Sequence, residues 1–421
     1  MGFSATDIPW VDPAELAASV AGQDGDMAFL HSSLKTGYSG QFSLLAWDAE
    51  HTYTGYDFDV VPPAPSIPLF GYFGYELGRT LETIPETKPS FIDLPFLHLA
   101  QFRQVLRFDH HRQIIESWQG KTPQLPTVLA RQYEASAPGI AKLESNMSKH
   151  SYHQAVQDAL NCIADGHFYQ VNLTRKFFGR FERPVPTFDL YRRLIGASPA
   201  PYSAFLRLEG TSILSSSPEL FLKINDGMIT SRPIKGTAPR GKTQSEDADQ
   251  KTALAESRKD HAENLMIVDL VRHDLSRVSI PGSVNVSELC TVDSFPTVHH
   301  LSSVIQGSIA DGKTSIDAFK AAFPPGSMTG APKIAAMRWL AEREAVNRGA
   351  YSGALGWFLE NEAELSVVIR TLIVQEDRFE FQVGGGIVAD STPEAEWMET
   401  IYKAEGILRS LGINTEAIKV I

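Results

Sequence analysis

The stretch RFEFQVGGGIVADSTPEAEWMETIYKAEG (378–406) joins a predicted strand to a predicted helix through three consecutive glycines. Its first part, RFEFQVG (378–384), has the apolar content of a strand, and the segment from Glu394 to Leu411 has the apolar period of a helix. Glycine lets backbone N–H groups come close to an anion, and a helix N-terminus attracts one. This order of elements favours an anion site, with a plain tight turn as the alternative. No GK[ST] follows the glycines, so a nucleotide is not indicated.

Carboxylates at helical spacing accompany this stretch. Glu396 and Glu399 are three residues apart within it, and Asp260 and Glu263 repeat the spacing in RKDHAENLMIVDL (258–270), so each pair shares one helix face. Acidic residues at this spacing often only solvate a surface. Four carboxylates that converge from two helices would instead suit Mg²⁺, which prefers oxygen ligands and shares its shell with anionic substrates. We therefore predict a Mg²⁺ site on these four side chains.

Two basic residues stand in settings that solvation does not readily explain. Arg370 lies in the otherwise apolar predicted strand SVVIRTLIV (366–374), where a charge is costly without a partner, and arginine is a natural clamp for a carboxylate. Lys235, in RPIKGTAPRG (232–241), could simply face solvent. If it is desolvated near other cations, its amine can become a neutral nucleophile. Glu219, on the preceding predicted strand, is a candidate for the same layer of the structure.

Further predicted strands and helices surround these segments. Strands are expected at 167–177, 202–208, 212–217, 219–224, 228–233 and 351–358, and helices from Ser151 to Gly166, from Glu246 to Val278 and from Lys333 to Glu344. Runs of strands separated by helices, without a regular βαβ rhythm, predict an α+β fold built on antiparallel sheet. We expect a strand-rich N-terminal part at 1–120, a connection at 121–150 and a further region at 151–421.

The composition excludes several classes of protein. The 421 residues are 43% hydrophobic and 21% charged, which is enough to bury a large core. A formal charge of −12 would repel nucleic-acid phosphates, so no nucleic-acid partner is expected. No apolar run approaches the length of a membrane span, and MGFSATDIPW (1–10) lacks the features of a secretory signal, so a cytoplasmic protein without membrane contact is expected. Cys162 and Cys290 stand far apart, which excludes disulfide scaffolds and zinc ribbons.

Taken together, these segments resemble the chorismate-utilising enzymes, which include the anthranilate, isochorismate and salicylate synthases. The resemblance runs from about Ser151 to Leu411 and rests on an ordered set of motifs: PIKGT (233–237), KDHAENLMIVDLVRHDLSRV (259–278), FPTVHHLSS (295–303), FPPGSMTGAPK (323–333), GAYSGALGW (349–357), VVIRT (367–371) and GGGIVADSTPEAEWMETIYKAEG (384–406). It implies an anthranilate-synthase-component-I-like fold, with two large facing antiparallel β-sheets, helices outside and the active site between the sheets. One departure is His273, which stands where the family usually has asparagine.

Three positions distinguish members of this family. The motif PIKGT has Lys235 where anthranilate synthases have alanine, and this lysine is typical of members that aminate chorismate at ring carbon 4. Gln170 stands where the enzymes that add water carry a lysine base, and the pair His299-His300 also resembles the aminating type. The resemblance therefore implies conversion of chorismate and ammonia to 4-amino-4-deoxychorismate, the first step from chorismate to p-aminobenzoate in folate biosynthesis. Anthranilate synthase activity and a non-catalytic scaffold that binds a glutaminase are the alternatives.

The resemblance also assigns roles within the site. It implies that Mg²⁺ is held by Glu263 and Glu399, with Glu396 and Asp260 acting through waters. The catalytic candidates are Lys235 as nucleophile, Glu219 as acid and His300, for which a satisfied buried histidine is the alternative. The implied substrate-binding residues are Gly236, Thr237, Tyr351, Arg370, Gly384, Gly385, Gly386 and Lys403. Lys403 lies four residues after Glu399 in the last predicted helix, so it can face the same site.

Two partners are implied as well. Neither Cys162 nor Cys290 lies in the glycine-flanked turn of a glutaminase nucleophile, so a separate glutamine amidotransferase subunit is expected to supply ammonia. AFLHSSLKTGYSGQFSLL (28–45) and PYS (201–203) resemble the segments that form a tryptophan pocket in this family. The candidate contacts to tryptophan are Ser32, Pro201, Tyr202 and Ser203, and ordinary core packing is the alternative.

Overall fold

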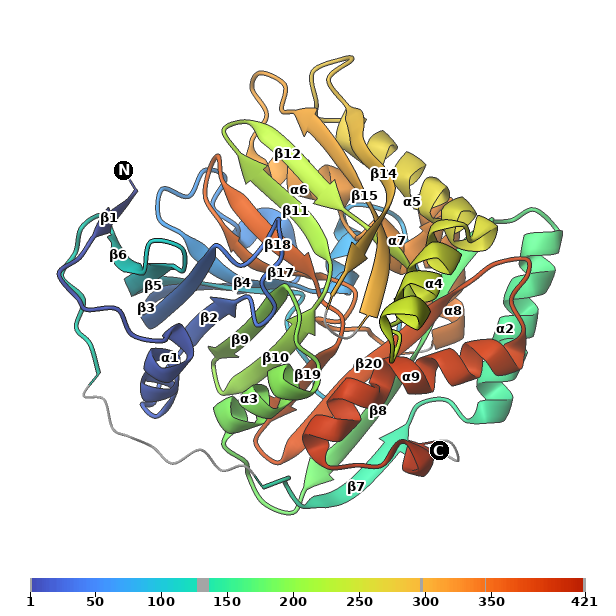
Figure 1. Cartoon of the computed structure of the whole chain (residues 1–421), viewed down its shortest axis with the longest axis horizontal. Coiled ribbons are helices and arrows are strands. Elements are labelled where there is room, and N and C mark those ends of the chain that lie inside the picture. The colour runs from blue at the N-terminus through green and yellow to red at the C-terminus, as the bar shows by residue number, and fades with distance from the viewer. Residues whose placement is uncertain (1, 127–135, 296–297, 345, 419–421) are drawn as a thin grey trace.

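Twenty strands of the described chain form one continuous antiparallel sheet in the computed structural model (Figure 1). The structure describes residues 2–126, 136–295, 298–344 and 346–418. The strand pairings divide this sheet into two arms, which meet where the long strands β3 (Phe42–Gly55) and β5 (Leu97–Asp109) pair along their length.

The first arm runs outward from β5 by antiparallel pairing. Its strands, in spatial order, are β4 (Leu69–Phe73), β17 (Ala354–Phe358), β18 (Ala363–Val367), β11 (Leu220–Asn225), β12 (Met228–Arg232), β15 (Val298–Ser308) and β14 (Asn285–Ser294). Strand β13 (Ile234–Pro239) continues beyond β12 and also pairs with β15. This arm therefore carries Lys235 and His300 on adjacent strands.

The second arm runs outward from β3. Its strands, in spatial order, are β2 (Met27–His31), β9 (Tyr202–Leu208), β10 (Thr211–Ser217), β19 (Thr371–Gln375), β20 (Arg378–Ile387), β8 (Gln170–Phe181) and β7 (Ile140–Ser145). Three short strands complete the sheet: β16 (Gly330–Ala331) on β8, and β1 (Phe3–Ala5) on β6 (Ile114–Trp118), which pairs with β5. This arm carries the glycine run.

Side chains of the two arms pack against each other. One buried cluster joins Phe70 and Leu355 of the first arm to Leu206, Ile213 and Ile373 of the second. The α+β class and the antiparallel sheet are thus confirmed, and the two facing sheets that the family implies correspond to these arms. The parts 1–120 and 151–421 share the sheet, because β2 pairs with β9 and β4 pairs with β17.

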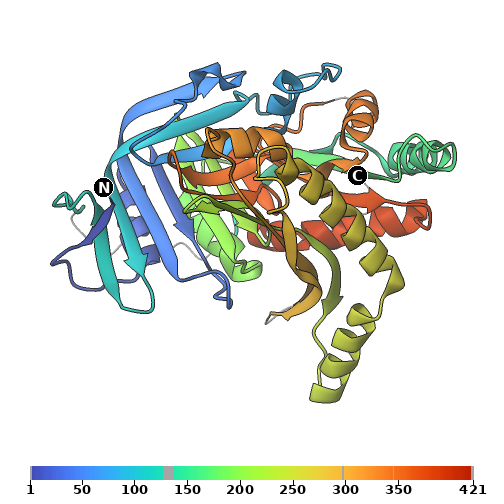
Figure 2. The ribbon, with the colours of Figure 1, turned by 90° about the horizontal axis from the view of Figure 1, so that it is seen from above.

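Helices cover the outer faces of both arms (Figures 1 and 2). The second arm packs against α1 (Pro13–Ala21), α2 (Lys149–Ala164), α3 (Thr187–Ala197), α8 (Lys333–Glu344) and α9 (Pro393–Leu411). The first arm packs against α5 (Arg258–Ser276) and α6 (Ser315–Ala322). The remaining helices are α4 (Gln244–Ala255), α7 (Gly326–Thr329) and the 3₁₀ turns η1 (Phe58–Val60), η2 (Tyr75–Thr80) and η3 (Thr415–Ile418).

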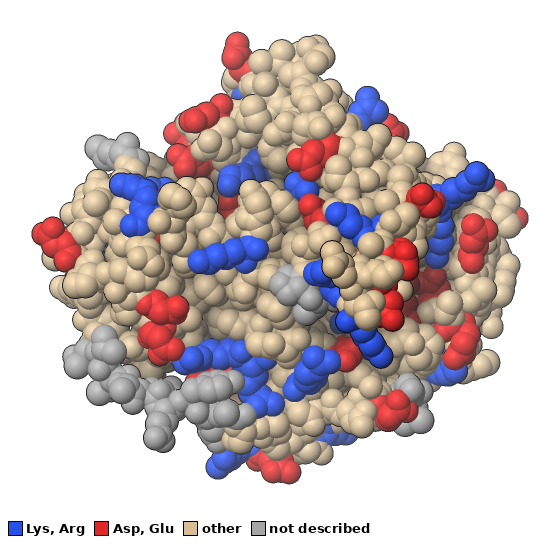
Figure 3. All heavy atoms as spheres, in the orientation of Figure 1, with Lys and Arg blue, Asp and Glu red and all other residues tan. Residues whose placement is uncertain are grey.

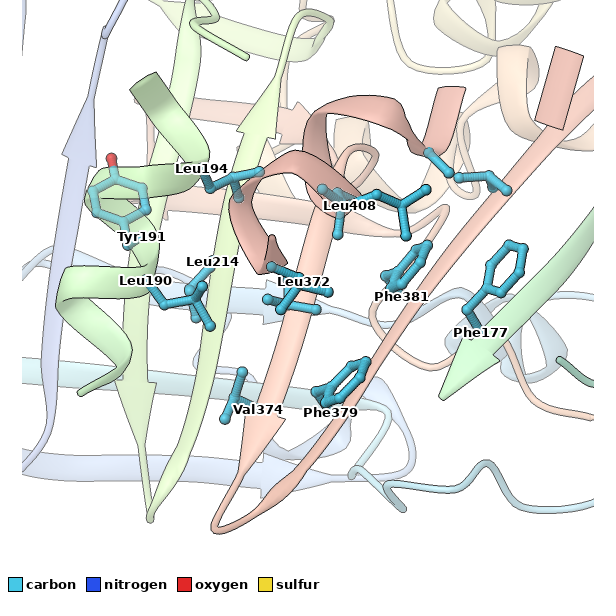
Figure 4. Close-up of a cluster of buried hydrophobic side chains, with 14 of the residues drawn as sticks. Phe177, Leu190, Tyr191, Leu194, Leu214, Leu372, Val374, Phe379, Phe381 and Leu408 are labelled. Carbon is cyan, nitrogen blue, oxygen red and sulfur yellow. The ribbon is translucent and has the colours of Figure 1, made fainter. Parts of the chain in front are cut away.

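Local sequence explains the position of α9. Thr392 accepts a hydrogen bond from the backbone N–H of Ala395, Pro393 occupies the first turn, and Gly412 ends the helix with a φ of 73°. Leu408 then packs with Phe381 and Leu372 beneath the helix, in the cluster of Figure 4. The helix is thereby fixed against the strand that carries the glycines.

The structure corrects several predicted boundaries. The helix predicted over 246–278 is broken into α4 and α5, because Ser257 caps a new helix by accepting from the N–H of Asp260. Ser148, rather than Ser151, caps α2. Part of the expected connection at 121–150 is strand β7, and its residues 127–135 lie outside the described chain.

The predicted strand SVVIRTLIV (366–374) is also two strands. Strand β18 ends at Val367 in the first arm, and β19 begins at Thr371 in the second. Arg370 adopts a left-handed φ of 50° between them. The chain crosses here from one arm to the other, which a single strand cannot do.

Candidate active site

The glycine run lies inside strand β20 rather than in a turn. Gly384, Gly385 and Gly386 face Thr174, Leu173 and Asn172 of β8 in antiparallel register. A Cβ at Gly385 would come within 2.8 Å of Glu396 Oε2, and one at Gly386 would overlap the amide of Gln170 and lie 3.5 Å from Nζ of Lys235. The glycines are therefore required by close packing: they let α9 and the opposite arm approach this strand.

The carboxylates of α9 line this approach. Glu396 is buried, its Oε1 accepts a 2.6 Å hydrogen bond from Ser391, and its Oε2 has no hydrogen-bond partner among the described residues. Burial raises the pKa of Glu396, and the charge of Glu399 raises it further. Glu399 accepts from Nζ of Lys403 at 2.6 Å. Burial opposes its ionisation, but the Lys403 ammonium holds the pKa of Glu399 below its usual value.

Lys403 belongs to the same group of contacts. Its Nζ also donates a 2.8 Å hydrogen bond to the carbonyl oxygen of Gly384. The expected i, i+4 relationship between Glu399 and Lys403 thus brings the ammonium against the glycine run.

The α5 carboxylates face the site from the other arm. Glu263 lies 3.8 Å from Nζ of Lys259, and its side chain is mostly buried. Burial raises the pKa of Glu263, and the charges of Asp260 and Glu399 add to this, while Lys235 and Lys259 oppose it. Asp260 packs against Gly236: a Cβ added to Gly236 would lie 3.0 Å from the Cβ of Asp260. Glu263 of α5 and Glu399 of α9 are therefore close enough to repel each other.

This donor set fits Mg²⁺ in its chemistry. All four side chains offer carboxylate oxygens, Glu396 keeps one buried oxygen without a described partner, and the mutual repulsion would be relieved by a cation. As placed, no group of three or more His, Cys, Asp or Glu side chains within the described chain lies close enough to hold a metal ion. The structure therefore places the four carboxylates as two facing pairs and not as the assembled four-ligand cluster, and the Mg²⁺ site stays a prediction.

Lys235 and Glu219 meet through one serine. Ser327, at α7, donates a 2.6 Å hydrogen bond to Glu219 Oε1, and its carbonyl oxygen lies 3.5 Å from Nζ of Lys235. Burial raises the pKa of Glu219 to about 7, although Ser327 and Lys235 oppose the shift. Burial lowers the pKa of Lys235, and Lys403 adds to the effect, while Glu263, Glu219 and Glu399 oppose it. An acid poised near neutrality thus lies beside an amine whose charge is disfavoured.

His300 is buried on β15 beside Thr237. Its Nδ1 lies 2.8 Å from Thr237 Oγ1, and the strands β13 and β15 pair at these two residues. Burial, with repulsion from Arg370 and His299, lowers the pKa of His300 to about 3. The imidazole is therefore neutral at physiological pH, which suits a hydrogen-bonding role and leaves its catalytic role a prediction.

Arg370 and Tyr351 lie near the crossing between the two arms, where the backbone N–H of Ser352 donates to the carbonyl oxygen of Val368. Arg370 lies at the crossing between the arms, where burial lowers the pKa of its guanidinium. Its charge acts on His300, so the two side chains face the same space. Tyr351 is buried in the turn before β17, and burial raises the pKa of its hydroxyl. Both remain candidates for holding substrate carboxylates.

Two contacting residues were not among the predicted site residues. Ser327 stands in the quoted motif FPPGSMTGAPK, so the motif contained the signal but no local pattern singled out the serine. Gln170 is fully buried against Gly386, and neither polar atom of its amide has a hydrogen-bond partner in the described chain. The sequence identified it only as a position that differs between members of the family.

The predicted tryptophan contacts line a separate cavity of about 700 Å³. Its walls include Ser32 from the segment after β2 and Pro201, Tyr202 and Ser203 at the start of β9. Ser32 donates to the carbonyl oxygen of Leu34, and Ser33 hydrogen-bonds Ser203 at 2.7 Å. The two sequence segments that resembled a pocket are thus brought together by the pairing of β2 with β9.

The surface and the helices add two general findings. On the face drawn in Figure 3, Lys and Arg side chains lie interspersed with Asp and Glu side chains. Among the described helices, none combines the length and the apolar character needed to cross a bilayer.

Comparisons with known proteins point to one family. A sequence profile of the family described as chorismate binding enzyme matches residues 31–409. The chain is 39% identical to aminodeoxychorismate synthase component 1 of Salmonella typhimurium over 358 residues, 83% of this chain and 78% of that protein. It is 36% identical to an anthranilate synthase component 1 of Haloarcula marismortui over 390 residues, 86% of this chain and 76% of that one.

Solved structures show the same fold. Anthranilate synthase component I from Streptococcus pneumoniae superposes with a TM-score of 0.76 at 27% identity, covering 89% of this chain and 95% of that one. The profile match, the sequence relatives and the site between the two sheet arms lead to one conclusion. The chain belongs to the family of chorismate-binding enzymes.

Proposed function

We propose that this chain aminates chorismate at ring carbon 4 with ammonia and forms 4-amino-4-deoxychorismate, the precursor of p-aminobenzoate in folate biosynthesis. The observation that carries the proposal is the position of Lys235, whose amine lies at the glycine run of the opposite arm and beside Ser327 and Glu219. The relatives named aminodeoxychorismate synthase component 1 support it.

Chorismate carries two carboxylates, an enolpyruvyl ether and a hydroxyl on ring carbon 4. Arg370, Tyr351 and Lys403 offer donors for the carboxylates, together with backbone N–H groups of the glycine run. Gly236 and Thr237 lie beside Asp260 and His300 and would bound the ring. The proposed substrate therefore bridges the two arms of the sheet.

Hydroxide is a poor leaving group, so the hydroxyl on carbon 4 must take up a proton as it departs. Glu219 is suited to this step because its pKa of about 7 keeps a large protonated fraction at neutral pH. The proton passes to the departing oxygen, which leaves as water. Glu219 is then ionised beside the positively charged nitrogen of the Lys235 adduct.

Lys235 supplies the nucleophile for a double displacement. Its neutral amine forms a bond to ring carbon 2, the two ring double bonds shift, and the bond between carbon 4 and oxygen breaks. Ammonia then attacks carbon 4, the double bonds shift back, and the bond between carbon 2 and Nζ breaks, so that Nζ leaves as a neutral amine. The new ammonium group on carbon 4 returns a proton to Glu219. The nitrogen therefore ends on carbon 4, whereas direct attack on carbon 2 would lead toward anthranilate.

We propose Mg²⁺ as the cofactor, held by Glu263 and Glu399 with Glu396 and Asp260 beside them. When bound, Mg²⁺ supplies Lewis-acid stabilisation of negative charge on a substrate carboxylate. Glu399 also offsets the repulsion between the Lys403 and Lys235 side chains, because it pairs with Lys403.

Ammonia is proposed to come from a separate glutamine amidotransferase subunit. Cys162 lies on α2, and Cys290 lies on β14 with its sulfur 3.5 Å from Asn264 Oδ1. Burial raises the pKa of the Cys290 thiol, which is the opposite of what an activated nucleophile needs. A chain with these cysteines should use ammonium and not glutamine.

One experiment tests the function. The purified chain is incubated with chorismate, Mg²⁺ and ammonium, and the product is identified by mass. We expect a non-aromatic amine that retains the enolpyruvyl group. Fluorescent anthranilate with free pyruvate would instead identify an anthranilate synthase, and no turnover with intact chorismate binding would identify a scaffold.

We further propose that the 700 Å³ cavity binds tryptophan. Its volume and its mixture of hydroxyl-bearing and aromatic walls at Ser32, Tyr202 and Ser203 support an aromatic amino acid as occupant. The cavity is separate from the residues that surround Lys235.

A further inference from the structure

Arg348 is a buried cation near the site, with 1% of its surface exposed. Its Nε and Nη2 form a forked pair with the carboxylate of Glu344, both at 2.7 Å. Its Nη1 donates to the carbonyl oxygen of Met328 at 2.8 Å and to Ser352 Oγ at 3.2 Å. Its Nη2 also donates to the carbonyl oxygen of Asn172 at 2.7 Å. Every N–H donor of the guanidinium is therefore used.

The surroundings of Arg348 are fixed in the same way. Glu344 accepts from the N–H and the hydroxyl of Thr174, at 2.9 and 2.7 Å. Glu76, which is 2% exposed, accepts from the backbone N–H groups of Arg348 and Gly349. The ring of Tyr75 lies 4.4 Å from the guanidinium carbon. Arg348 thus sits in a closed network that joins η2, α7, α8 and β8.

The residues that Arg348 and Glu344 contact are each one position, or one strand pairing, away from a site residue. Met328 follows Ser327, which holds Glu219 and Lys235. Asn172 and Thr174 are the register partners of Gly386 and Gly384. Ser352 follows Tyr351.

We propose that Arg348, paired with Glu344, is a positioning residue of the active site: its forked guanidinium sets Ser327, the partner strand of the glycine run and Tyr351 in register with one another. This proposal rests on the proposed function only for which reaction is catalysed; the contacts of Arg348 do not depend on it. An arginine is needed because a lysine is a point donor and cannot hold the carboxylate and two carbonyl oxygens in one plane. The effect on the chemistry passes through Ser327, because its hydroxyl is the donor to Glu219.

The chain offers a matched control for this proposal. Lys176 and Glu380 form a second ion pair buried to a similar degree, at 2% and 1% exposure, with Nζ and Oε1 2.8 Å apart. It lies on the same pair of strands, β8 and β20, but Glu380 accepts from Ser90 and from the backbone N–H of Ile92. Nζ of Lys176 lies 3.5 Å from the main-chain carbonyl oxygen of Arg348, a contact with the backbone and not with the guanidinium. Apart from this one contact, the pair holds the segment 90–92, and within the described chain its side chains form no hydrogen bond to Ser327, Asn172 or Ser352.

The test compares Arg348→Lys with the double variant Lys176→Met/Glu380→Met. Thermal unfolding, kcat and KM for chorismate, and the pH dependence of kcat are measured with saturating ammonium. We expect Arg348→Lys to lower kcat about 10- to 100-fold, because small displacements of catalytic groups cost rates of this order. We also expect the alkaline limb of the kcat profile to move to higher pH, since Ser327 would no longer favour the ionised form of Glu219. The control should keep kcat within about twofold.

Two results would overturn the proposal. One is a lowered unfolding temperature in Arg348→Lys with kcat, KM and pH profile unchanged, which would make the residue structural only. The other is an equal loss of kcat in the control at an equal loss of stability. If Arg348→Lys does not fold, Glu344→Gln retains the shape of the pair and must show the same shift of the alkaline limb.

The readout separates this proposal from the proposed function. Chorismate consumption gives the rate, and product mass gives the identity of the reaction. If the wild-type chain makes anthranilate, the proposed function fails, while the comparison of rates still decides the role of Arg348.

Discussion

Ser327 donates a 2.6 Å hydrogen bond to Glu219, and the carbonyl oxygen of the same serine lies 3.5 Å from Nζ of Lys235. A single short segment therefore supports both the proposed acid and the proposed nucleophile. Because burial raises the pKa of Glu219 while it disfavours the charge on Lys235, both groups are moved toward their neutral forms. This pairing links the geometry of the site to its pH dependence.

The first prediction concerns this pH dependence. An acid must be protonated to act, so kcat should fall as the pH rises above about 7, the pKa of Glu219. Ser327→Ala removes a hydrogen bond to the ionised carboxylate and should move this alkaline limb to higher pH. Ser327→Thr keeps the hydroxyl and serves as control. The profile is measured at saturating free ammonia at each pH, and an alkaline limb that stays in place in Ser327→Ala would contradict the assignment of Glu219.

The second prediction concerns the carboxylates. Glu263→Gln and Glu399→Gln should each lower turnover roughly 100-fold or more, because each removes a charge that a bound cation needs. Glu394→Gln is the control, since Glu394 lies on α9 like Glu399 but is exposed and paired with Lys149. Turnover is measured over a range of Mg²⁺ concentrations, with thermal unfolding to check the fold. Near-normal turnover of either variant at saturating Mg²⁺ would refute the metal site.

The third prediction concerns the covalent intermediate. Chorismate and Mg²⁺ without an ammonia source should increase the mass of the peptide that contains Lys235 by chorismate minus water. Lys235→Ala should abolish the adduct and lower amination at carbon 4. Lys259→Ala should keep the adduct, because Lys259 is half exposed and lies on α5 beside Glu263. If Lys235→Ala aminates chorismate at the full rate and the adduct never forms, Lys235 acts only through its charge.

The fourth prediction concerns the separate cavity. Titration calorimetry should detect binding of tryptophan to the wild-type chain and no binding of alanine at the same concentration. Ser32→Leu adds volume inside the cavity and should abolish the heat of binding while leaving turnover of chorismate unchanged. Undiminished tryptophan binding in Ser32→Leu would show that tryptophan binds elsewhere.

The fifth prediction concerns the buried pair Lys176 and Glu380. Lys176→Met alone should destabilise the chain by about 3–5 kcal/mol, because it leaves a buried carboxylate without its cation. Lys176→Met/Glu380→Met should recover most of that loss, since two apolar side chains need no partner. Denaturant unfolding gives both values. A double variant less stable than the single one would show that the pair stabilises the fold through its charges.

Local signals in the sequence predicted a large part of this protein. Apolar periods predicted α9 and α8, and short apolar runs predicted strands β9 to β12. The spacing of Glu399 and Lys403 predicted that both face the same site, because residues four apart on a helix are neighbours whatever surrounds them, and the structure adds their direct contact. The ordered motifs were enough to indicate the family.

Only the tertiary structure decided the rest. The glycine run lies in a strand because its small residues let Glu396, Gln170 and Lys235 approach from three other elements, and no local pattern distinguishes this use from a turn. Arg348 reaches Asn172 and Met328, which are 176 and 20 residues away in the chain. Such contacts depend on how the two arms of the sheet are paired and placed. Pairing between distant strands is set by the packing of the whole chain, whereas helix caps and periods act within a few residues.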